Sequence, residues 1–234
     1  MRSKLFVPGV RPELFAKALA GDAGALSFDL EDSVPEARKG EARETVSALL
    51  QSAPLLATAK IVVVRVNAVG TPYLAADLAA VARTGVDLLN LPKLESAQDV
   101  LAAVALLEKS EAPNGVARPI GLLANIETPR GLRLAAEIAS AHPRVAGLQL
   151  GLADLFQPLG IDRRDPVNVH ATLYAMRMAA AEAGVFAWDA AFADIGDADG
   201  FRAEAGMARR LGDGGKRCIH PSEGALAKQA FQPG

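Results

Sequence analysis

The sequence predicts a (β/α)8 barrel, a closed ring of eight parallel strands in which a helix follows each strand. Three observations support this fold class. Short β-rich runs alternate with longer amphipathic stretches along the chain, which indicates a parallel sheet. Most of the runs are apolar throughout, as strands covered on both faces are. Eight such units fit the 234 residues of the chain, close to the roughly 250 residues typical of this barrel.

The first four predicted strands are short apolar runs. They are KLFVPG at 4–9, ALSFDLE at 25–31, KIVVVRVN at 60–67 and DLLNLPKL at 87–94. Proline and glycine close the first run, and the other three consist largely of the aliphatic residues that fill barrels. The first three runs end on a turn former or a polar residue, which sets their boundaries.

The last four predicted strands continue this pattern. They are PIGLLANIE at 119–127, VAGLQLG at 145–151, VFAWDAAF at 185–192 and KRCIHP at 216–221. Short apolar runs bounded by Gly or Pro are typical of strands that are buried on both faces.

Helical periodicity fills the segments between the strands. The clearest stretches are 11–21, 35–50, 73–85, 96–110 and 169–184. Several open on Pro or Ser and close on Gly, which are common residues at helix starts and ends. A doubly wound sheet is the alternative, but VPGVRP after the first run lacks the G-x-G-x-x-G spacing of a dinucleotide fold. No linker or low-complexity tract interrupts the pattern, so we expect one domain over residues 1–234.

The composition indicates a soluble globular protein. Half of the residues are apolar and the formal net charge is −2. Basic residues are spread among acids, so neither a nucleic-acid footprint nor a polybasic membrane patch is expected. No apolar run approaches the roughly 20 residues of a membrane span, and the first apolar stretch is too short for a signal peptide. The lone cysteine, Cys218, is expected to be an inert buried thiol, and a reducing cytoplasm fits it best.

Polar residues gather where the predicted strands end, which is where barrels of this kind carry their chemistry. The residues at these ends are Gly9, Glu31, Asp32, Arg65, Asn67, Lys93, Glu127, Asp154, Asp189 and His220. Helix starts also favour acids, so Asp32 and Asp189 fit a structural role equally well. Asp29 could pair with Arg65 inside the barrel as a structural salt bridge. That pair would also orient Arg65, whose planar fork suits a substrate carboxylate.

Glu127 and Asp154 follow neighbouring apolar strands, and for the two together a helix-start explanation is weaker. Two carboxylates with no Cys or His nearby suit Mg²⁺, which takes one or two protein carboxylates and completes its octahedron with water and substrate oxygens. The three histidines show no zinc spacing. His142 and His170 are expected at the surface, and His220 in a structural hydrogen bond.

The stretch LQLGLADLFQPLG provides a candidate substrate contact after the sixth predicted strand. Gly151 lets the backbone approach a ligand, and the N–H groups of Leu152, Ala153 and Asp154 could receive a carboxylate oxygen. A plain strand-to-loop turn explains the same residues. Together, the strand ends indicate a metal-assisted enzyme acting on a small oxo or hydroxy acid, with an enolate as the intermediate.

Six segments carry a family resemblance: RSKLFVPGVRPELFAKAL, LSFDLEDSVPEARKGEAR, VVRVN, LPKLES, ANIETPRGL and LQLGLADL. In this order and spacing the chain resembles the HpcH/HpaI aldolase/citrate lyase family, and within it the branch of the citrate lyase beta subunits. The resemblance runs from Arg2 to about Phe231. It implies a (β/α)8 barrel that binds Mg²⁺ and forms a trimer or hexamer. It also implies that a C–C bond is made or broken in a CoA or acyl-carrier thioester of citryl, citramalyl or malyl type.

The resemblance implies roles for individual residues at the strand ends. Glu127 and Asp154 match the metal ligands of the family, and Arg65 matches the arginine that holds the oxo-acid carboxylate. Glu31 and Asp32 match an acidic pair that lies around the water shell of the metal or around Arg65.

A second set of implied contacts concerns the CoA carrier and the proton. Phe6, Arg11 and Lys17 fall where related lyases contact CoA, although Lys17 could equally be a solvated helix residue. Family members continue past the last strand with a lid whose aspartate acts as acid or base, and a proton shuttle contributes about 10²–10⁴-fold. No acid follows Glu223 here, so we expect the lid aspartate to have no counterpart. The alternatives to the thioester lyase are therefore a carrier-free 2-oxo-acid aldolase, a thioester hydrolase and a non-catalytic oxo-acid-binding subunit.

Overall fold

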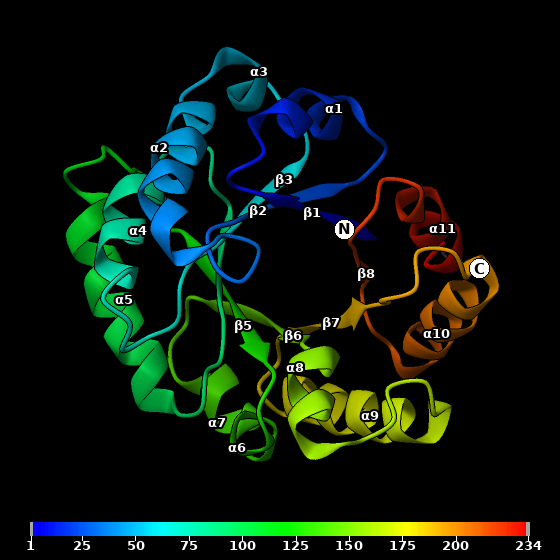
Figure 1. The fold of residues 1–234 in the computed structure, drawn as a ribbon. Coiled ribbons are helices and arrows are strands. Elements are labelled where there is room, and N and C mark those ends of the chain that lie inside the picture. Colours follow the sequence, from blue (N-terminus) through cyan, green and yellow to red (C-terminus); the bar gives the residue numbers. More distant parts are fainter. Residues whose placement is uncertain (1, 233–234) are drawn as a thin grey trace.

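The structure is a computed structural model that describes residues 2–232, and its strands close into the predicted (β/α)8 barrel (Figure 1). Each strand pairs in parallel with the next strand in the chain, and β8 pairs with β1 to close the ring. The strands are β1 (Ser3–Pro8), β2 (Ala25–Asp29), β3 (Ile61–Arg65), β4 (Leu88–Leu91), β5 (Gly121–Ile126), β6 (Val145–Leu150), β7 (Phe186–Ala191) and β8 (Lys216–Cys218). All eight predicted strands are confirmed.

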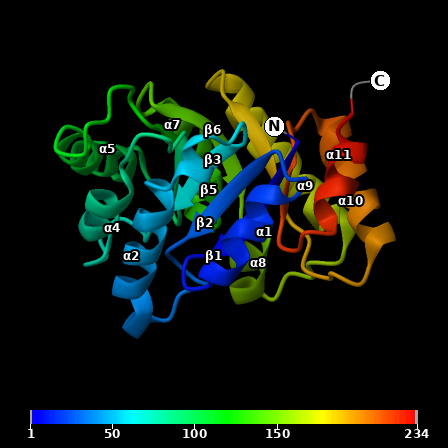
Figure 2. The same cartoon turned by 90° about the horizontal axis from the view of Figure 1, so that it is seen from above.

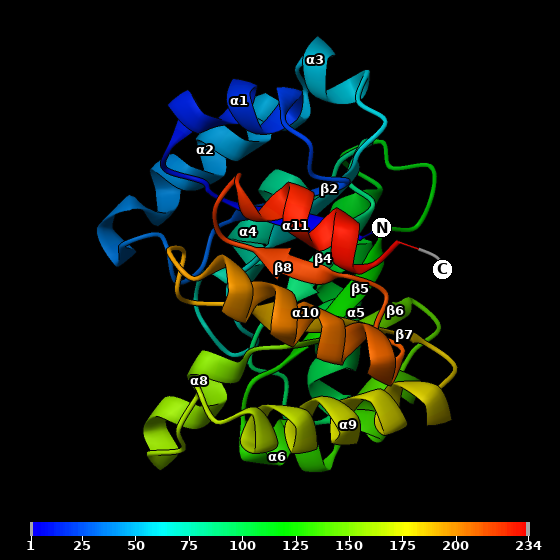
Figure 3. The ribbon, with the colours of Figure 1, turned by 90° about the vertical axis from the view of Figure 1, so that its right-hand side faces the viewer.

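Helices surround the barrel on its outside (Figure 1). They are α1 (Phe15–Ala20), α2 (Lys39–Leu50), α3 (Ala53–Leu56), α4 (Leu74–Val81), α5 (Ala97–Glu111), α6 (Pro129–Arg133), α7 (Ala135–Ser140), α9 (Pro166–Glu182), α10 (Ala198–Leu211) and α11 (Glu223–Ala230). The short helix α8 (Leu152–Phe156) instead sits at one end of the barrel (Figure 2). The last long helices, α9, α10 and α11, lie side by side along the outer layer (Figure 3). Short 3-10 turns at Pro12–Leu14, Glu36–Arg38 and Gln157–Leu159 complete the connections.

Most elements begin or end within a few residues of their predicted bounds, and two of the differences have a clear local reason. Helix α9 begins at Pro166 rather than 169, because the Asp165 side chain caps it by accepting from the N–H of Val167 at 2.8 Å. Strand β8 ends at Cys218 rather than 221. The N–H groups of the next two residues donate to Glu223 Oε2, at 2.7 and 3.2 Å, instead of to a neighbouring strand.

The outer face of the barrel is apolar and packs against the helices. Leu26 and Phe28 of β2 are fully buried there, and Phe28 meets Phe15 of α1 edge to face at 5.2 Å. This layer belongs to one continuous apolar core that runs around the molecule. Packing against this layer buries the outer faces of the parallel strands.

The inner face of the barrel is polar, which differs from the prediction of apolar strand bodies. Lys4, Asn125 and Gln149 are fully buried, and Lys4 of β1 donates to Gln149 of β6. These two strands are not neighbours, so their contact crosses the interior. A small apolar cluster, formed by Ala25, Leu123 and Trp188, lies apart from the outer core. A run that looks apolar on average thus hides polar residues at alternate positions, which share one face of a strand.

Two further predictions concern burial and membranes. Cys218 is buried and unpaired, as expected, and burial raises the pKa of its thiol to about 12. No helix within residues 2–232 combines the length and apolar character that a membrane crossing requires.

The core assignment predicts how two leucines respond to truncation. Leu26 is fully buried in β2, so Leu26→Ala should lower the free energy of unfolding by about 2–5 kcal/mol. Leu56 in α3 is 53% exposed, so Leu56→Ala should change it by no more than about 0.5 kcal/mol. Urea denaturation of both variants measures the difference. Equal losses would show that Leu26 is not a core residue.

Candidate active site

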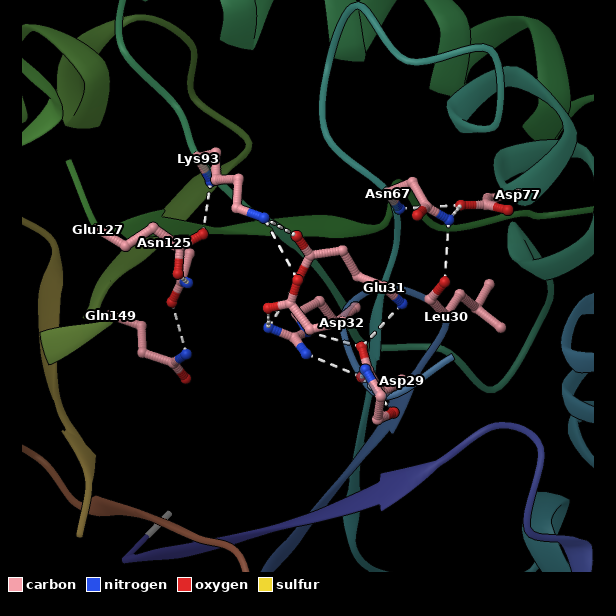
Figure 4. A network of polar contacts seen from close by, with 12 residues as sticks. Asp29, Leu30, Glu31, Asp32, Asn67, Asp77, Lys93, Asn125, Glu127 and Gln149 are labelled. Atoms are coloured by element: carbon pink, nitrogen blue, oxygen red, sulfur yellow. Dashed lines mark hydrogen bonds and ion pairs between the residues drawn. The ribbon is translucent and has the colours of Figure 1, made fainter. Parts of the chain in front are cut away.

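An arginine and an aspartate on adjacent strands form the base of the site, and Figure 4 labels the aspartate, Asp29. Asp29 ends β2 and Arg65 ends β3, and the two are paired in the sheet register. Arg65 Nε and Nη2 donate to the two carboxylate oxygens of Asp29 at 2.6 and 2.8 Å. Burial opposes the ionisation of Asp29, but the charge and hydrogen bonds of Arg65 outweigh it and lower the pKa of the carboxyl. The predicted pairing of these residues is confirmed.

The remaining nitrogen of Arg65 meets the acidic pair that follows β2. Its Nη1 lies 2.8 Å from Glu31 and 3.2 Å from Asp32. Lys93 Nζ approaches the same two carboxylates, at 2.7 Å from Glu31 and 3.3 Å from Asp32. Burial still raises the pKa of Glu31, although the charges of Arg65 and Lys93 oppose it. Arg65 therefore forms ion pairs with three carboxylates, and Lys93 forms ion pairs with two of the same three.

Lys93 contributes its backbone as well as its ammonium group. It has φ = 53°, which makes it the one non-glycine residue with positive φ within residues 2–232. In that conformation its N–H donates to Glu127 Oε1 at 2.8 Å, while its side chain reaches Glu31. Left-handed backbone costs a non-glycine residue free energy and is often found at functional sites. The sequence placed Lys93 at a strand end without giving it a role.

Glu127, directly after β5, is 1% exposed, and within residues 2–232 no cationic side chain forms an ion pair with it. Its carboxylate accepts from the Lys93 N–H and from Asn125 Nδ2. Burial, together with the charges of Glu31 and Asp154, raises the pKa of Glu127 to about 8. A buried carboxyl with two further carboxyls nearby is stabilised in its ionised form when a cation lies among them.

The first turn of α8 brings Asp154 toward Glu127. Gly151 precedes this helix, and a Cβ at that position would lie 2.5 Å from Glu127 Oε2. Glycine is therefore required because the Glu127 side chain occupies the space beside the backbone. Leu152 is buried, whereas Ala153 and Asp154 are exposed at the start of α8. The group that the Gly151 backbone approaches closely is thus the Glu127 side chain, whereas the sequence predicted a ligand there.

A chain of amide groups connects Glu127 with the interior of the barrel. Asn125 Oδ1 accepts from Gln149 Nε2 at 2.6 Å, and Gln149 Oε1 accepts from Lys4 Nζ. Lys4 Nζ also lies 4.9 Å from the centre of the Trp188 ring. Figure 4 shows the part of this chain from Gln149 to Glu127. Sequence reasoning missed it, although Asn125 lies two residues before Glu127 and so faces the same side of its strand.

The predicted CoA contacts do not lie together. Phe6 of β1 faces the interior, with its ring centre 4.6 Å from the Arg65 guanidinium carbon. Arg11 is exposed and pairs with Glu13, and Lys17 is exposed on α1. An open apolar groove of about 670 Å³ runs between α1, α2 and α3, outside the barrel, and contains none of the residues at the mouth.

Two other strand-end residues have structural roles. Asp189 points away from the mouth and forms a fully buried ion pair with Lys216 at 2.5 Å, which Glu204 of α10 shares at 2.8 Å. His220 Nδ1 lies 2.7 Å from Ser222 Oγ, so the predicted structural hydrogen bond of His220 is confirmed.

The described residues can offer a metal ion two or three carboxylates, not a closed cage. Within residues 2–232 no group of three or more His, Cys, Asp or Glu side chains is arranged as a metal site. Glu127 and Asp154 alone suit Mg²⁺, which commonly keeps several waters and binds through one or two carboxylates. The fold and the site together define a barrel enzyme with a carboxylate-lined active site at its mouth.

The chain belongs to the HpcH/HpaI aldolase/citrate lyase family, whose model matches residues 2–221. It is 37% identical to the citrate lyase subunit beta of Escherichia coli, over 99% of this chain and 77% of that protein. It is 32% identical to an L-malyl-CoA/beta-methylmalyl-CoA lyase of Cereibacter sphaeroides, over 99% of this chain and 79% of that protein. A solved citrate lyase beta subunit of Mycobacterium tuberculosis, complexed with oxaloacetate and magnesium, superposes with a TM-score of 0.81. The two are 35% identical, over 99% of this chain and 96% of that one.

The close approach at Gly151 predicts a loss of cation affinity when a side chain is added. Gly151→Ala places a methyl group 2.5 Å from Glu127 Oε2, so the carboxylate must move. Calorimetric titration with Mg²⁺ or Mn²⁺ should show affinity reduced by about 10–100-fold, as for other changes to groups that orient a ligand. Gly40→Ala, on an exposed part of α2 with free space around it, is the control and should not alter affinity. Unchanged affinity in Gly151→Ala would contradict this account.

The raised pKa of Glu127 predicts a pH-dependent stability in metal-free buffer. Its carboxyl titrates at about 8 when folded against an ordinary value of 4.5, so the folded state holds the proton more tightly. The contribution of Glu127 to the free energy of unfolding is fully present below its pKa in the unfolded chain. It is lost as the pH rises through its pKa in the folded protein. Urea unfolding in EDTA should therefore show Glu127 lowering the free energy of unfolding between about pH 5 and pH 8. Glu127→Gln should remove that part of the pH dependence, and an unchanged profile would refute the assignment.

Proposed function

We propose that the protein is a Mg²⁺-dependent carbon–carbon lyase that cleaves or forms a hydroxyacyl-CoA thioester of the citryl-, citramalyl- or malyl-CoA type. The products of cleavage are an oxo acid and acetyl-CoA. The observation that carries the proposal is the buried Glu127 carboxylate, which lies near Asp154 and Glu31 and forms no ion pair with a cationic side chain of residues 2–232. The names of its relatives, a citrate lyase subunit beta and a malyl-CoA lyase, support the same chemistry.

Glu127 and Asp154 are the proposed metal ligands. Mg²⁺ held there would polarise the oxo-acid oxygens and stabilise the negative charge that develops on them. The Lys93 N–H and Asn125 Nδ2 fix the two oxygens of Glu127, so this ligand is oriented before any cation binds. The magnesium and oxaloacetate in the mycobacterial relative agree with this choice of cation and acid.

Arg65 is the proposed contact for the oxo-acid carboxylate. Asp29 already holds its Nε and Nη2, so the edge that a substrate can reach is Nη1, beside Glu31 and Asp32. Asp29 thus orients Arg65, while the acidic pair limits how strongly Arg65 attracts a further anion. The backbone N–H groups of Leu152 and Ala153 at the start of α8, next to Gly151, are further candidate donors to the same acid.

Cleavage requires one proton to leave the hydroxyl oxygen and one to reach the acetyl carbon. The hydroxyl carbon becomes the oxo group of the released acid, and the electron pair of the broken C–C bond passes to the thioester enolate. Glu31 is a carboxyl at the mouth whose pKa is raised by burial, and we assign it the proton exchange. Arg11 and Lys17 remain proposed carrier contacts at the surface, whereas the position of Phe6 against Arg65 favours a contact with the acid.

Three coarser properties complete the proposal. We place the chain in the cytoplasm, as one domain over residues 1–234, and in a homo-oligomer of three or six copies. The oligomer rests on the family resemblance, and the compartment rests on the lone, unpaired cysteine. Gel filtration with light scattering measures the number of copies directly.

The proposal predicts a metal-dependent cleavage that one conservative substitution removes. Assays of malyl-, citramalyl- and citryl-CoA with Mg²⁺ should release acetyl-CoA and an oxo acid from at least one thioester, and EDTA should stop the reaction. Glu127→Gln should lower kcat by about 10²–10³-fold, because an amide keeps the shape of the side chain but not its charge. Glu111→Gln removes a carboxylate that pairs with Arg144 outside the barrel, and it should leave kcat within about twofold.

Other outcomes of the same assay identify the alternatives. Release of an oxo acid from free hydroxy acids would indicate a carrier-free aldolase, and free CoA without C–C cleavage would indicate a hydrolase. Metal-dependent binding of oxo acid without turnover of any thioester would indicate a binding subunit.

A further inference from the structure

Arg217 is a second arginine of the barrel interior, and sequence reasoning gave it no role. It lies in β8, where its neighbours in the sheet are Lys4 of β1 and Ala191 of β7. Its guanidinium carbon is 3.9 Å from the centre of the Phe6 ring, and the same ring lies 4.6 Å from the guanidinium carbon of Arg65. Two arginine head groups therefore share one aromatic side chain at the mouth.

The guanidinium of Arg217 has no anionic partner among the residues that the structure describes. Within residues 2–232 no carboxylate lies within ion-pair distance of it, and its buried Nε has no hydrogen-bond acceptor. The residue as a whole is only partly buried, so the accessible part of the side chain lies beyond Nε, at the terminal nitrogens. Because this strand position faces the interior, those nitrogens are reached through the mouth.

Two other partly buried arginines of this protein hold carboxylates. Arg144 binds Glu111 through two nitrogens at 2.7 and 2.8 Å, and Arg163 binds Glu204 through two nitrogens at 2.7 and 2.9 Å. Arg65 is occupied by three acids. A buried charge without a partner is costly, so a guanidinium left free in this setting is consistent with a partner that arrives from outside.

The surrounding charges identify the kind of partner. Burial and the positive charge of Arg65 lower the pKa of Arg217 to about 10, which leaves it charged at neutral pH. Burial and the charges of Arg217 and Arg65 also lower the pKa of Lys4. An anion here would relieve this repulsion among cations, and a planar carboxylate matches the two terminal nitrogens of an arginine.

We propose that Arg217 binds a second carboxylate of the acid substrate and so selects a dicarboxylic oxo acid over a monocarboxylic one. The inference rests on the proposed function, in which one carboxylate of the acid lies toward Glu127, Asp154 and Arg65. Phe6 holds the guanidinium in place by stacking beneath it. An acid of the oxaloacetate type reaches both positions, whereas an acid of the pyruvate type fills only the first.

The test compares the affinities of two acids for three proteins. Freshly prepared oxaloacetate and pyruvate are titrated calorimetrically, with Mg²⁺ present, into the full chain, Arg217→Met and Arg210→Met. Arg217→Met keeps an unbranched side chain against Phe6 but removes the planar guanidinium group that would bind a carboxylate. It should weaken oxaloacetate binding by about 10–100-fold and change pyruvate binding by less than about threefold. Arg210 is exposed on α10, so Arg210→Met removes the same charge elsewhere and should change neither affinity.

Folding provides a second readout. Removing a buried cation that has no protein partner should leave the free energy of unfolding equal to that of the unaltered chain or higher, whereas loss of a structural arginine would lower it. Arg217→Lys keeps a charge without the planar fork and should give an intermediate loss of oxaloacetate affinity. The pair malate and lactate, which does not decarboxylate, repeats the comparison with stable acids.

The outcomes separate this inference from the proposed function. Equal losses for both acids, or no loss for either, in Arg217→Met would overturn the assignment of Arg217 and leave the lyase proposal standing. If the unaltered chain binds neither acid with Mg²⁺, both fail. Selective loss of the dicarboxylate with unchanged stability supports the inference.

Discussion

The ion pair between Arg65 and Asp29 is the interaction on which the rest of the mouth depends. Both residues are almost fully buried at the ends of adjacent strands, and two parallel hydrogen bonds fix the plane of the guanidinium. That plane directs Nη1 to Glu31 and Asp32, and these acids in turn hold the ammonium of Lys93. Lys93 then supplies the N–H that binds Glu127. A single pair in the sheet thus sets the position of a carboxylate three strands away.

This arrangement separates two kinds of carboxylate. Asp29 and Asp32 have lowered pKa values because, despite their burial, cations and donors surround them. Glu127 and Glu31 have raised pKa values, with burial as the main cause. The first kind serves as fixed negative charge, and the second holds its proton more tightly and is the kind that can exchange a proton or accept a cation. These acids lie close together, and their pKa values differ because each has a different number of hydrogen-bond donors and cations around it.

The sequence predicts the barrel well, because apolar runs and helix boundary residues recur regularly and each strand needs burial on its outer face. It also identifies the rim residues, since parallel strands bring their C-terminal ends to one edge. It does not predict the polar interior, because Lys4, Asn125 and Gln149 sit at alternate positions within runs that are apolar on average. Nor could it predict the role of Arg217. That role depends on Arg217 having no carboxylate partner within residues 2–232 while Arg65 binds three carboxylates. Only the packed structure shows this difference.

The amide chain beneath Glu127 has a direction that a single residue determines. A lysine ammonium can only donate, so Gln149 must present its oxygen to Lys4 and its nitrogen to Asn125. Asn125 must then accept with its oxygen, which leaves its nitrogen for Glu127. Each amide has one orientation that satisfies both of its neighbours, and the reversed orientation would put two donors face to face. The polarity of the whole row is therefore set at the far wall of the barrel, and the carboxylate at the mouth always meets a donor.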